Sequence, residues 1–352
     1  MKKILVSILI IIVLSLLSCI ILYNYNLSAV NDDSTEIEFE VKEGSNFYSI
    51  APLLKEKGLI KSEFCYKLYI KFNVKNGLET GVYSLRSNMS VKELVKALNN
   101  SKKNIFSVTF KEGKNMRNVA SVIAENTNST EEDFYKLIND KNYLDELKNN
   151  YWFITDDIMN QNIYYSLEGY LYPNTYSFSS KNVSSKDLIK SMLDELNKKL
   201  SEHKKEIQNS DFSIHEILTL ASIVELEAST SEDRAMVAQV FINRLNSNMT
   251  LGSDVTTYYA SKVDMSERDL TTTELNDRNY YNTRSTFLAG KLPVGPICNP
   301  SIDSIKAVLY PTKNDYYYFV SDKNKKIYFS KTNSENLNKK QELIEAGLWY
   351  TY

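Results

Sequence analysis

The segment IEFEVKEG, residues 37–44, returns as FSVTFKEG at residues 106–113, 69 positions later (113 − 44). Apolar and polar residues alternate in both segments, as they do in half-buried strands, and each ends in Lys-Glu-Gly. The apolar residues after each glycine have helical spacing, and Tyr66-Lys67-Leu68 recurs as Tyr135-Lys136-Leu137 with the same offset. Each copy is therefore predicted to fold as a strand, a glycine turn, a helix, a short loop and a second helix.

The first copy resembles the small sugar-binding module called LysM in this order of strand, turn and helix. A spacer that holds the rest of the chain away from a membrane is the alternative, since a fold alone does not assign a function. Between the copies, Ser90 and Glu93 form a capping-box pattern ahead of a helix. We assign the two strand-helix modules to residues 37–104 and 105–148.

A long apolar segment lies near the N-terminus. From Ile4 to Tyr23 the only polar residues before the terminal tyrosine are three serines, and such a helix spans about 30 Å, the thickness of a bilayer core. Lys2 and Lys3 precede the segment and acidic residues follow it, which predicts a cytoplasmic N-terminus and an extracytoplasmic remainder. We therefore expect a single-pass protein of the cell membrane, with a cytoplasmic tip (1–3), a transmembrane helix (4–24) and a linker (25–36).

Cys19 leaves an alternative for this segment. The residues LLSC, 16–19, resemble a lipoprotein processing site. The apolar run continues through residues 20–22, as it does in a membrane span and not in a cleaved signal. An uncleaved anchor is the prediction, and lipidation of Cys19 is the alternative.

The composition argues against several classes of function. The chain has 352 residues, a formal net charge of −2, three cysteines and two histidines. Nucleic-acid binding needs a concentrated basic face, a disulfide framework needs more cysteines, and a histidine-rich zinc site needs more histidines. No metal and no cofactor are predicted.

Residues 149–352 are predicted to form a catalytic domain. Two capping-box patterns mark the starts of helices with apolar faces: Ser213 with Glu216, and Thr230 with Asp233. Residues 250–300 contain three prolines and are expected to be irregular. A helix at 301–310 and a hairpin of 316–320 with 326–330 follow. The predicted fold class is α+β: a transmembrane helix, small strand-helix modules and a mixed α+β catalytic domain.

Several familiar catalytic motifs are missing from the sequence. It contains no Gly-x-Ser-x-Gly elbow, no His-Glu-x-x-His motif and no phosphate-binding glycine loop. A cysteine peptidase built on Cys298 and His215 is one alternative. An extracytoplasmic enzyme that relies on carboxylates instead points towards glycosides as substrates.

Glu168 stands alone among apolar and aromatic residues in LEGYLYPNTYSF, residues 167–178. Such surroundings disfavour the charged form of a carboxyl group and raise its pKa, as a general acid at neutral pH requires. Tyr170 and Tyr172 offer flat faces and hydroxyl groups to a sugar. The alternative is an ordinary loop glutamate beside packed aromatic rings.

Glu225 and the pair Asn243-Arg244 are further candidates. Glu225 follows the apolar face of a predicted helix, where it either points into a cleft or makes an ion pair at the surface. Asn243 and Arg244 end the next helix, where they either bind a substrate carboxylate or pair with an acidic neighbour.

These segments together resemble the membrane-bound endolytic murein transglycosylase family. The matching pieces follow the family's order over nearly all of the predicted extracytoplasmic part. They are LEGYLYPNTYSF (167–178), ASIVELEA (221–228), VAQVFINRL (237–245), YNT (281–283), PVGPICNPSIDSIKAVLYP (293–311) and YYYFVSD (316–322).

The resemblance implies an activity and a set of site residues. Such enzymes cleave between N-acetylmuramic acid and N-acetylglucosamine in nascent peptidoglycan, leave a 1,6-anhydro end and terminate strand elongation, with peptidoglycan synthases as candidate partners. Glu168 matches the catalytic glutamate, which acts first as the acid and then as the base. The positions expected to line the cleft are Glu225, Asn243, Arg244, Asp254, Tyr281, Asn282 and Thr283.

Four positions depart from the family pattern. Gly252 and Val255 stand beside Asp254 where the family usually has glutamine and proline, and Ile327 and Asn336 stand where it usually has histidine. These departures affect the expected substrate contacts at the rim of the cleft and leave Glu168 untouched. An inactive glycan-binding or scaffold protein of the cell-wall machinery is the alternative function.

Overall fold

The computed structural model describes residues 2–42, 44–74, 77–100, 106–178 and 181–349. Glu43 of the first Lys-Glu-Gly and the predicted module boundary at residues 104 and 105 lie outside these residues. The chain divides into a first unit, residues 1–107 with 177–181, and a second unit, residues 108–176 with 182–352. The finer division of the second unit at residues 148 and 149 stays a prediction.

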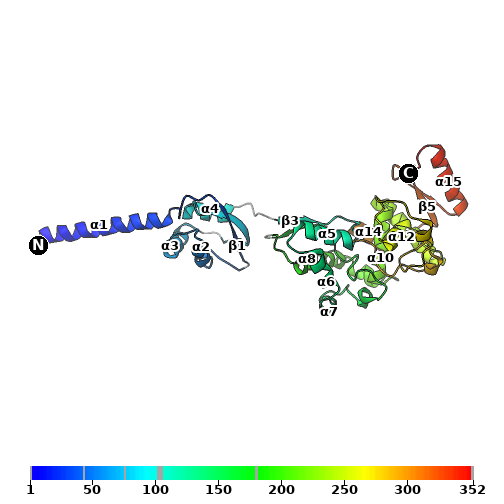
Figure 1. The fold of residues 1–352 in the computed structure, drawn as a ribbon, viewed down its shortest axis with the longest axis horizontal. Helices are drawn as coiled ribbons and strands as arrows, with labels where there is room; N and C mark the ends of the chain where they lie inside the picture. Colours follow the sequence, from blue (N-terminus) through cyan, green and yellow to red (C-terminus); the bar gives the residue numbers. More distant parts are fainter. Residues whose placement is uncertain (1, 43, 75–76, 101–105, 179–180, 350–352) are drawn as a thin grey trace. The chain divides into compact units, whose positions relative to one another are not determined.

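Helix α1 (Lys2–Leu27) opens the first unit (Figure 1). Its segment Ile8–Leu27 has the length and hydropathy of a membrane span, and its apolar side chains from Ile8 to Leu22 are exposed. α1 therefore fits a single-pass membrane anchor. The helix continues to Leu27 rather than ending at Asn24, so the non-helical connection begins at Ser28.

The remainder of the first unit packs three helices on a two-stranded antiparallel sheet. Strands β1 (Glu36–Val41) and β2 (Gly81–Arg86) pair with Ile37 opposite Leu85. The helices are α2 (Ala51–Glu56), α3 (Glu63–Asn73) and α4 (Val91–Asn100). The predicted capping box of α4 is confirmed, because Ser90 and Glu93 exchange hydrogen bonds between backbone and side chain. Sequence analysis did not anticipate β2, whose partner lies far away in the sequence.

The second copy of the repeat has the predicted order of elements. Strand β3 (Phe106–Thr109) leads through a turn to helices α5 (Met116–Asn126) and α6 (Glu131–Ile138). Gly44 and Gly113 occupy equivalent turns, with φ of +78° and +71°. The strand–turn–helix prediction is therefore confirmed for both copies, while the likeness to LysM stays a prediction.

Strand β3 pairs with β4 (Thr175–Phe178), which lies at the end of the Glu168 segment. Helix α7 (Lys141–Asn150) and the 3-10 helix η1 (Asp156–Met159) connect α6 to that segment. Residues 164–174 are thus a loop that leads into this short strand.

Helices form the core of the second unit. Their bounds are α8 (Ser185–Ser201), α9 (Lys204–Gln208), α10 (Ile214–Glu227), α11 (Ser231–Asn246) and α14 (Ile302–Leu309). Both predicted N-caps are confirmed. Ser213 accepts a hydrogen bond from the amide of Glu216, and Thr230 accepts one from the amide of Asp233. Helix α10 packs against α11, α12 and α14. Its residues from Ile214 to Val224 are buried except for the capping Glu216, and its last residues lie at the edge of the core.

Residues 250–300 are more regular than predicted. They contain α12 (Asp254–Ser261), α13 (Thr272–Asn276) and the 3-10 helix η2 (Thr286–Leu288), joined by loops. The expectation of an irregular segment is therefore wrong in part, because buried side-chain hydrogen bonds from residues 282 and 283 hold the short helices in place.

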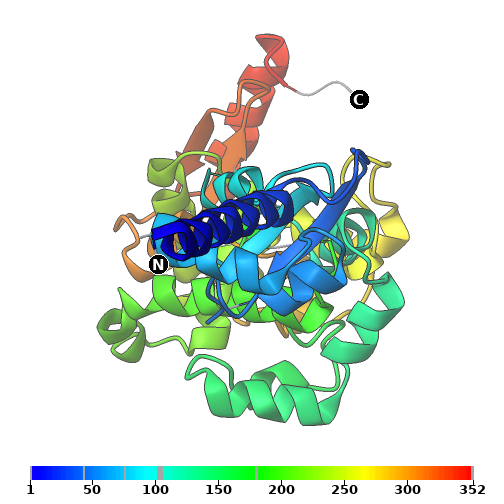
Figure 2. The ribbon, with the colours of Figure 1, turned by 90° about the vertical axis from the view of Figure 1, so that its left-hand side faces the viewer.

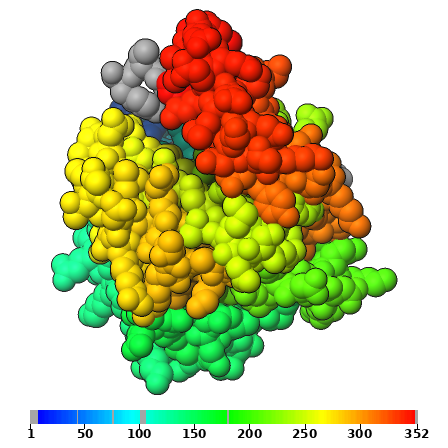
Figure 3. All heavy atoms as spheres, turned by 90° about the vertical axis from the view of Figure 1, so that its right-hand side faces the viewer, coloured from blue at the N-terminus to red at the C-terminus, as the bar shows by residue number. Residues whose placement is uncertain are grey.

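The C-terminal part confirms the predicted hairpin. Strands β5 (Tyr318–Ser321) and β6 (Ile327–Ser330) pair antiparallel, and α15 (Asn333–Glu345) packs on them. Figure 2 shows this hairpin and helix, in orange and red, projecting from the helical part of the second unit. In Figure 3 they share one face of that unit with the yellow residues of about 250–280. The mixed content of helices and small sheets confirms the α+β class.

Candidate active site

Glu168 lies in a tight turn that is held by close packing. Gly169, the next residue, has φ of +83°, a conformation that side chains with a Cβ rarely adopt. A Cβ at this position would lie 2.3 Å from the Cβ of Pro296. Glycine is therefore required here, and the turn directs the Glu168 side chain into the protein, where it is 1% exposed.

One carboxylate oxygen of Glu168 accepts two hydrogen bonds. Oε2 accepts from the amide of Met116 at 2.9 Å and from the hydroxyl of Tyr259 at 3.0 Å. Met116 is the first residue of α5, and the cap Asn115 already accepts from the next two amides, so the Met116 amide is free for Glu168. The carboxyl group thus meets the positive end of a helix dipole. Oε1 has no partner among the described residues.

Burial raises the pKa of Glu168 to about 8, against the smaller opposing effects of the Met116 amide, the Tyr259 hydroxyl and the positive charge of Arg117. The group therefore carries a proton at neutral pH. Because Oε2 already accepts two hydrogen bonds, we place that proton on Oε1. The free oxygen is thus the one that can act as an acid.

The second copy of the repeat is fastened to this turn through Asn299. The Gly113 amide donates to the Asn299 carbonyl, and the Asn299 amide donates to the carbonyl of Lys114. The side chain of Asn299 also accepts from the amide of Leu171, three residues after Glu168. Asn299 therefore aligns the start of α5 with the Glu168 turn.

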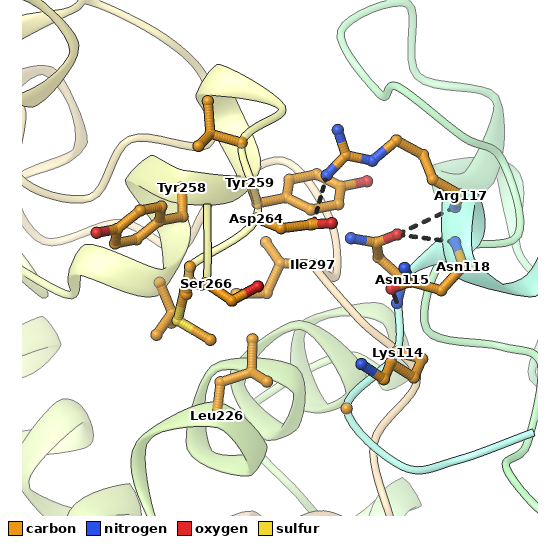
Figure 4. Close-up of a pocket in the computed structure, with 14 residues that line it drawn as sticks. Lys114, Asn115, Arg117, Asn118, Leu226, Tyr258, Tyr259, Asp264, Ser266 and Ile297 are labelled. Carbon is orange, nitrogen blue, oxygen red and sulfur yellow. Dashed lines mark hydrogen bonds and ion pairs between the residues drawn. The ribbon is translucent and has the colours of Figure 1, made fainter. Parts of the chain in front are cut away.

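A pocket of about 300 Å³ lies beside the start of α5 (Figure 4). Its walls come from residues 113–115, 117 and 118, from α12, from residues 263–266, and from Leu226 and Ile297. Arg117 crosses between two walls, since it pairs with Asp264 at 3.2 Å and donates to the Lys262 carbonyl. Tyr259 lines the pocket and hydrogen-bonds Glu168, so Glu168 lies directly behind this wall.

A second pocket, of about 280 Å³, adjoins the first. Its lining comes from residues 109–111 and from α5, and it shares Lys114 and Asn118 with the first pocket. The two pockets therefore lie on either side of these residues. Together they offer an extended surface rather than a single closed cavity.

Tyr281 is a predicted cleft residue that contacts Tyr259, the hydrogen-bond partner of Glu168. Its ring packs against those of Tyr164 and Tyr259, with 4.8 Å between ring centres in each case. Its hydroxyl accepts a hydrogen bond from the amide of Tyr164. Tyr281 is fully buried, so it supports Tyr259 rather than lining the pocket.

Tyr170 and Tyr172 point into the core. The hydroxyl of Tyr170 lies 2.8 Å from Nδ1 of His215, whose Nε2 lies 3.0 Å from the Val294 carbonyl. Tyr172 is 7% exposed. Neither tyrosine lines a described pocket, so their expected contact with sugar stays a prediction.

Cys298 does not form a catalytic pair with His215. Its thiol donates to the Ser222 carbonyl, and both ring nitrogens of His215 have the other partners just described. Burial also raises the pKa of the Cys298 thiol, the opposite of what a nucleophile requires. The cysteine peptidase alternative is therefore excluded.

Glu225 joins three segments of the second unit. It forms an ion pair with Arg234 at 2.9 Å. Its other oxygen accepts hydrogen bonds from the amide and hydroxyl of Ser301 and from the hydroxyl of Ser304, at the start of α14. These contacts make Glu225 a cap of α14 and a member of a buried ion pair, while its expected place in the cleft stays a prediction.

Asn243 and Arg244 hold the segment that leads into β5. Asn243 donates to the carbonyls of Asn314 and Tyr316. Arg244 donates to the carbonyls of Tyr317 and Leu251 and lies over the ring of Tyr318. Their hydrogen bonds are thus made within the protein.

Asp254, Asn282 and Thr283 organise the start of α12. Asp254 pairs with Arg284 at the surface. Asn282 is fully buried and donates to the carbonyls of residues 274, 275 and 277, while Thr283 bonds to Thr256. Of the four departures from the family pattern, Val255 is the one that lines the first pocket.

Sequence reasoning missed several residues of the Glu168 surroundings and of the adjoining pocket. Tyr259, Asn115, Arg117 and Asp264 carry no motif that marks them. The repeat offered one signal, because it predicted a helix start just after Gly113. It gave no sign that this helix start would face Glu168.

Comparison with known proteins places the chain in a family. The model of the YceG-like family matches residues 39–342. An endolytic murein transglycosylase of Bacillus subtilis is 32% identical over 90% of this chain and 87% of its own length. A protein of that name from Streptococcus pneumoniae is 28% identical over 88% of this chain, which spans 58% of the relative's length.

A solved structure shows the same fold. The crystal structure of a yceG-like protein from Listeria monocytogenes is 32% identical and matches with a TM-score of 0.63. The match covers 88% of this chain and 100% of that one. The chain therefore belongs to the YceG-like family.

Proposed function

We propose that this chain is an endolytic lytic transglycosylase that cleaves peptidoglycan between N-acetylmuramic acid and N-acetylglucosamine, with Glu168 as its acid and base. The observation that carries the proposal is the carboxyl group of Glu168, which is buried against the start of α5 beside a pocket and whose pKa is raised by that burial. The curated relatives named endolytic murein transglycosylases support the substrate class.

The geometry suits a reaction with a single carboxyl group. Oε1 donates its proton to the glycosidic oxygen as the bond from that oxygen to C1 of the muramic acid breaks. The Met116 amide and the Tyr259 hydroxyl then stabilise the carboxylate on Oε2. The carboxylate takes the proton of the C6 hydroxyl, whose oxygen bonds to C1 and closes the 1,6-anhydro ring. Glu168 regains its proton, so the reaction consumes no water and requires no second carboxylate.

The pocket offers room for sugar on the far side of Tyr259. Because Glu168 is 1% exposed, the glycan must displace side chains of this wall before it meets Oε1. The ion pair of Arg117 with Asp264 crosses the same pocket and is one contact that such a movement would open.

The charge distribution around α1 supports a location for the reaction. Lys2 and Lys3 precede the span and Asp32 and Asp33 follow it, which favours a cytoplasmic N-terminus and an extracytoplasmic second unit. The glycan strands of nascent peptidoglycan, the bilayer around α1 and a peptidoglycan synthase are the partners that this location implies. Protease added to intact spheroplasts should digest the chain beyond α1, and full protection would contradict this orientation.

Product analysis tests the activity. Mass spectrometry of sacculi digested with the purified protein should detect new chain ends carrying 1,6-anhydro-N-acetylmuramic acid. New reducing ends would identify a hydrolase instead. Binding to sacculi without any new ends would identify the inactive glycan-binding alternative.

A further inference from the structure

Helix α3 of the first unit carries two phenylalanines that face away from the protein. Phe64 and Phe72 are 74% and 73% exposed, whereas Tyr66 and Ile70 of the same helix are buried. Residues two apart lie about 200° apart around a helix, so each phenylalanine lies opposite a buried residue. Positions 64 and 72 are separated by about 12 Å along the axis and by about 80° around it, so both lie on the half of the helix that faces away from the core.

Helix α3 lies against the end of α1 (Figure 1). Leu27, the last residue of α1, packs on the core that contains Tyr66 and Ile70. Lys61, just before α3, lies 4.0 Å from the ring centre of Tyr25 and donates a hydrogen bond to Ser28. Since α1 fits a membrane span, these contacts hold α3 where that span leaves the bilayer.

The chemistry of the exposed face suits lipid headgroups. Lys67 and Lys71 accompany the phenylalanines on α3. Lys67 forms an ion pair at 3.1 Å with Glu63, the only acidic residue of the helix, and Lys71 lies beside the ring of Phe72. Aromatic rings combined with lysines are typical of helices that lie at a membrane interface, where the rings enter the headgroup layer and the ammonium groups meet lipid phosphates. In water, two such exposed rings would leave apolar surface without cover.

We propose that α3 lies on the surface of the bilayer that α1 crosses, with Phe64 and Phe72 inserted among the lipid headgroups. The proposal rests on α1 as the anchor and does not depend on the catalytic activity. With both α1 and α3 held by the bilayer, the first unit has a fixed orientation on the membrane instead of swinging on a tether.

Depth-dependent fluorescence quenching tests this contact. The full-length protein carrying Phe64→Trp or Phe72→Trp is reconstituted into phosphatidylglycerol-containing vesicles with phospholipids brominated near the headgroup. The emission of Trp152 and Trp349, measured on the wild type in the same vesicles, is subtracted. Both new tryptophans should lose most of their emission, and bromines near the end of the acyl chain should quench them less.

Tyr48→Trp provides a matched control. Tyr48 is another exposed aromatic of the first unit, at 47%, and it lies outside α3. Its emission should be unaffected by brominated lipid. The proposal is overturned if residues 64 and 72 are quenched no more than residue 48. It is equally overturned if they escape quenching and their emission instead changes with protein density, because a second copy of the chain would then cover this face.

Discussion

The amide nitrogen of Met116 lies 2.9 Å from Oε2 of Glu168 and donates a hydrogen bond to it. This bond joins the second copy of the sequence repeat to the candidate catalytic turn. The start of α5 therefore supplies both a donor and the positive end of a helix dipole to the carboxyl group. We infer that the second copy supports the active site.

Tyr259→Phe removes the other donor to Oε2. This hydrogen bond lowers the pKa of Glu168, so its loss should raise that pKa and move the alkaline limb of the activity profile to higher pH. Turnover should fall at least about tenfold, because a hydrogen bond to a charged group is worth roughly 1.5 to 3 kcal/mol, or about 10- to 150-fold in rate. The measurement is a pH–rate profile of muropeptide release from sacculi.

Tyr258→Phe is the control for this change. Tyr258 lines the same pocket without a hydrogen bond to Glu168 in the described structure. The alkaline limb of its pH–rate profile should lie at the same pH as that of the wild type. A downward movement of the limb in Tyr259→Phe would contradict the hydrogen-bond assignment.

Gly169→Ala should destabilise the second unit severely. The new Cβ would collide with Pro296 at 2.3 Å, and φ of +83° is itself unfavourable for alanine. Overpacking costs about 1 to 3 kcal/mol and the left-handed backbone about 1 to 2 kcal/mol. Gly44→Ala shares the positive φ but meets no atom within 4 Å, so it should cost only the backbone term. Hydrogen exchange measures the loss of stability in each unit separately. Equal losses for Gly169→Ala and Gly44→Ala would contradict the packing argument.

Arg244→Ala should lower stability as well as activity. The family resemblance implies that Arg244 lines the cleft, and in the structure its guanidinium group donates to the carbonyls of Tyr317 and Leu251. Their loss should cost about 3 kcal/mol in the free energy of unfolding. Arg284→Ala, which breaks an exposed ion pair with Asp254, should cost at most about 1 kcal/mol. Chemical denaturation measures the free energy of unfolding of both variants. An Arg244→Ala protein with wild-type stability but no activity would support a substrate-binding role for Arg244 instead.

Glu168 should make the stability of the wild type depend on pH. The folded chain keeps this proton up to about pH 8, whereas the unfolded chain loses it near the ordinary pKa of 4.5. The unfolded state therefore binds fewer protons between these values, and stability falls as the pH rises through them. Glu168→Gln does not titrate, so its melting temperature relative to the wild type should rise across this window. An unchanged difference between pH 4.5 and pH 8 would mean that Glu168 is not buried in its protonated form.

Local patterns made much of the fold predictable. The side chain of Ser213 and the amide of Glu216 lie three residues apart, so their pairing is visible in the sequence. The repeat showed both strand–turn–helix copies for the same reason, since each glycine turn is a local event. Strand β2 was not predicted, because its partner β1 lies about 45 residues away and no local pattern marks the pairing.

The site was harder to predict than the fold because its contacts join distant segments. The sequence could place Glu168 among aromatic residues, but not the Met116 amide 52 residues earlier or Tyr259 91 residues later. Asn282 shows the converse. A polar residue within a family motif suggests substrate binding, whereas its buried amide donates to three backbone carbonyls of the preceding segment.

The central claim is that Glu168 is the only acid and base of the reaction. Glu168→Gln keeps the size of the side chain but cannot deliver a proton to the glycosidic oxygen, and general acid–base catalysis contributes about 10² to 10⁴-fold. Glu227→Gln is the matched control, since Glu227 also has a raised pKa through burial but bonds to Ser253 rather than to a pocket wall.

The decisive measurement is the rate at which each purified variant forms 1,6-anhydro ends on isolated glycan strands. Glu168→Gln should lose at least about 10²-fold while it still folds and binds strands, and Glu227→Gln should retain most of the wild-type rate. A near wild-type rate for Glu168→Gln, together with an inactive Glu227→Gln, would contradict the assignment of the proton donor.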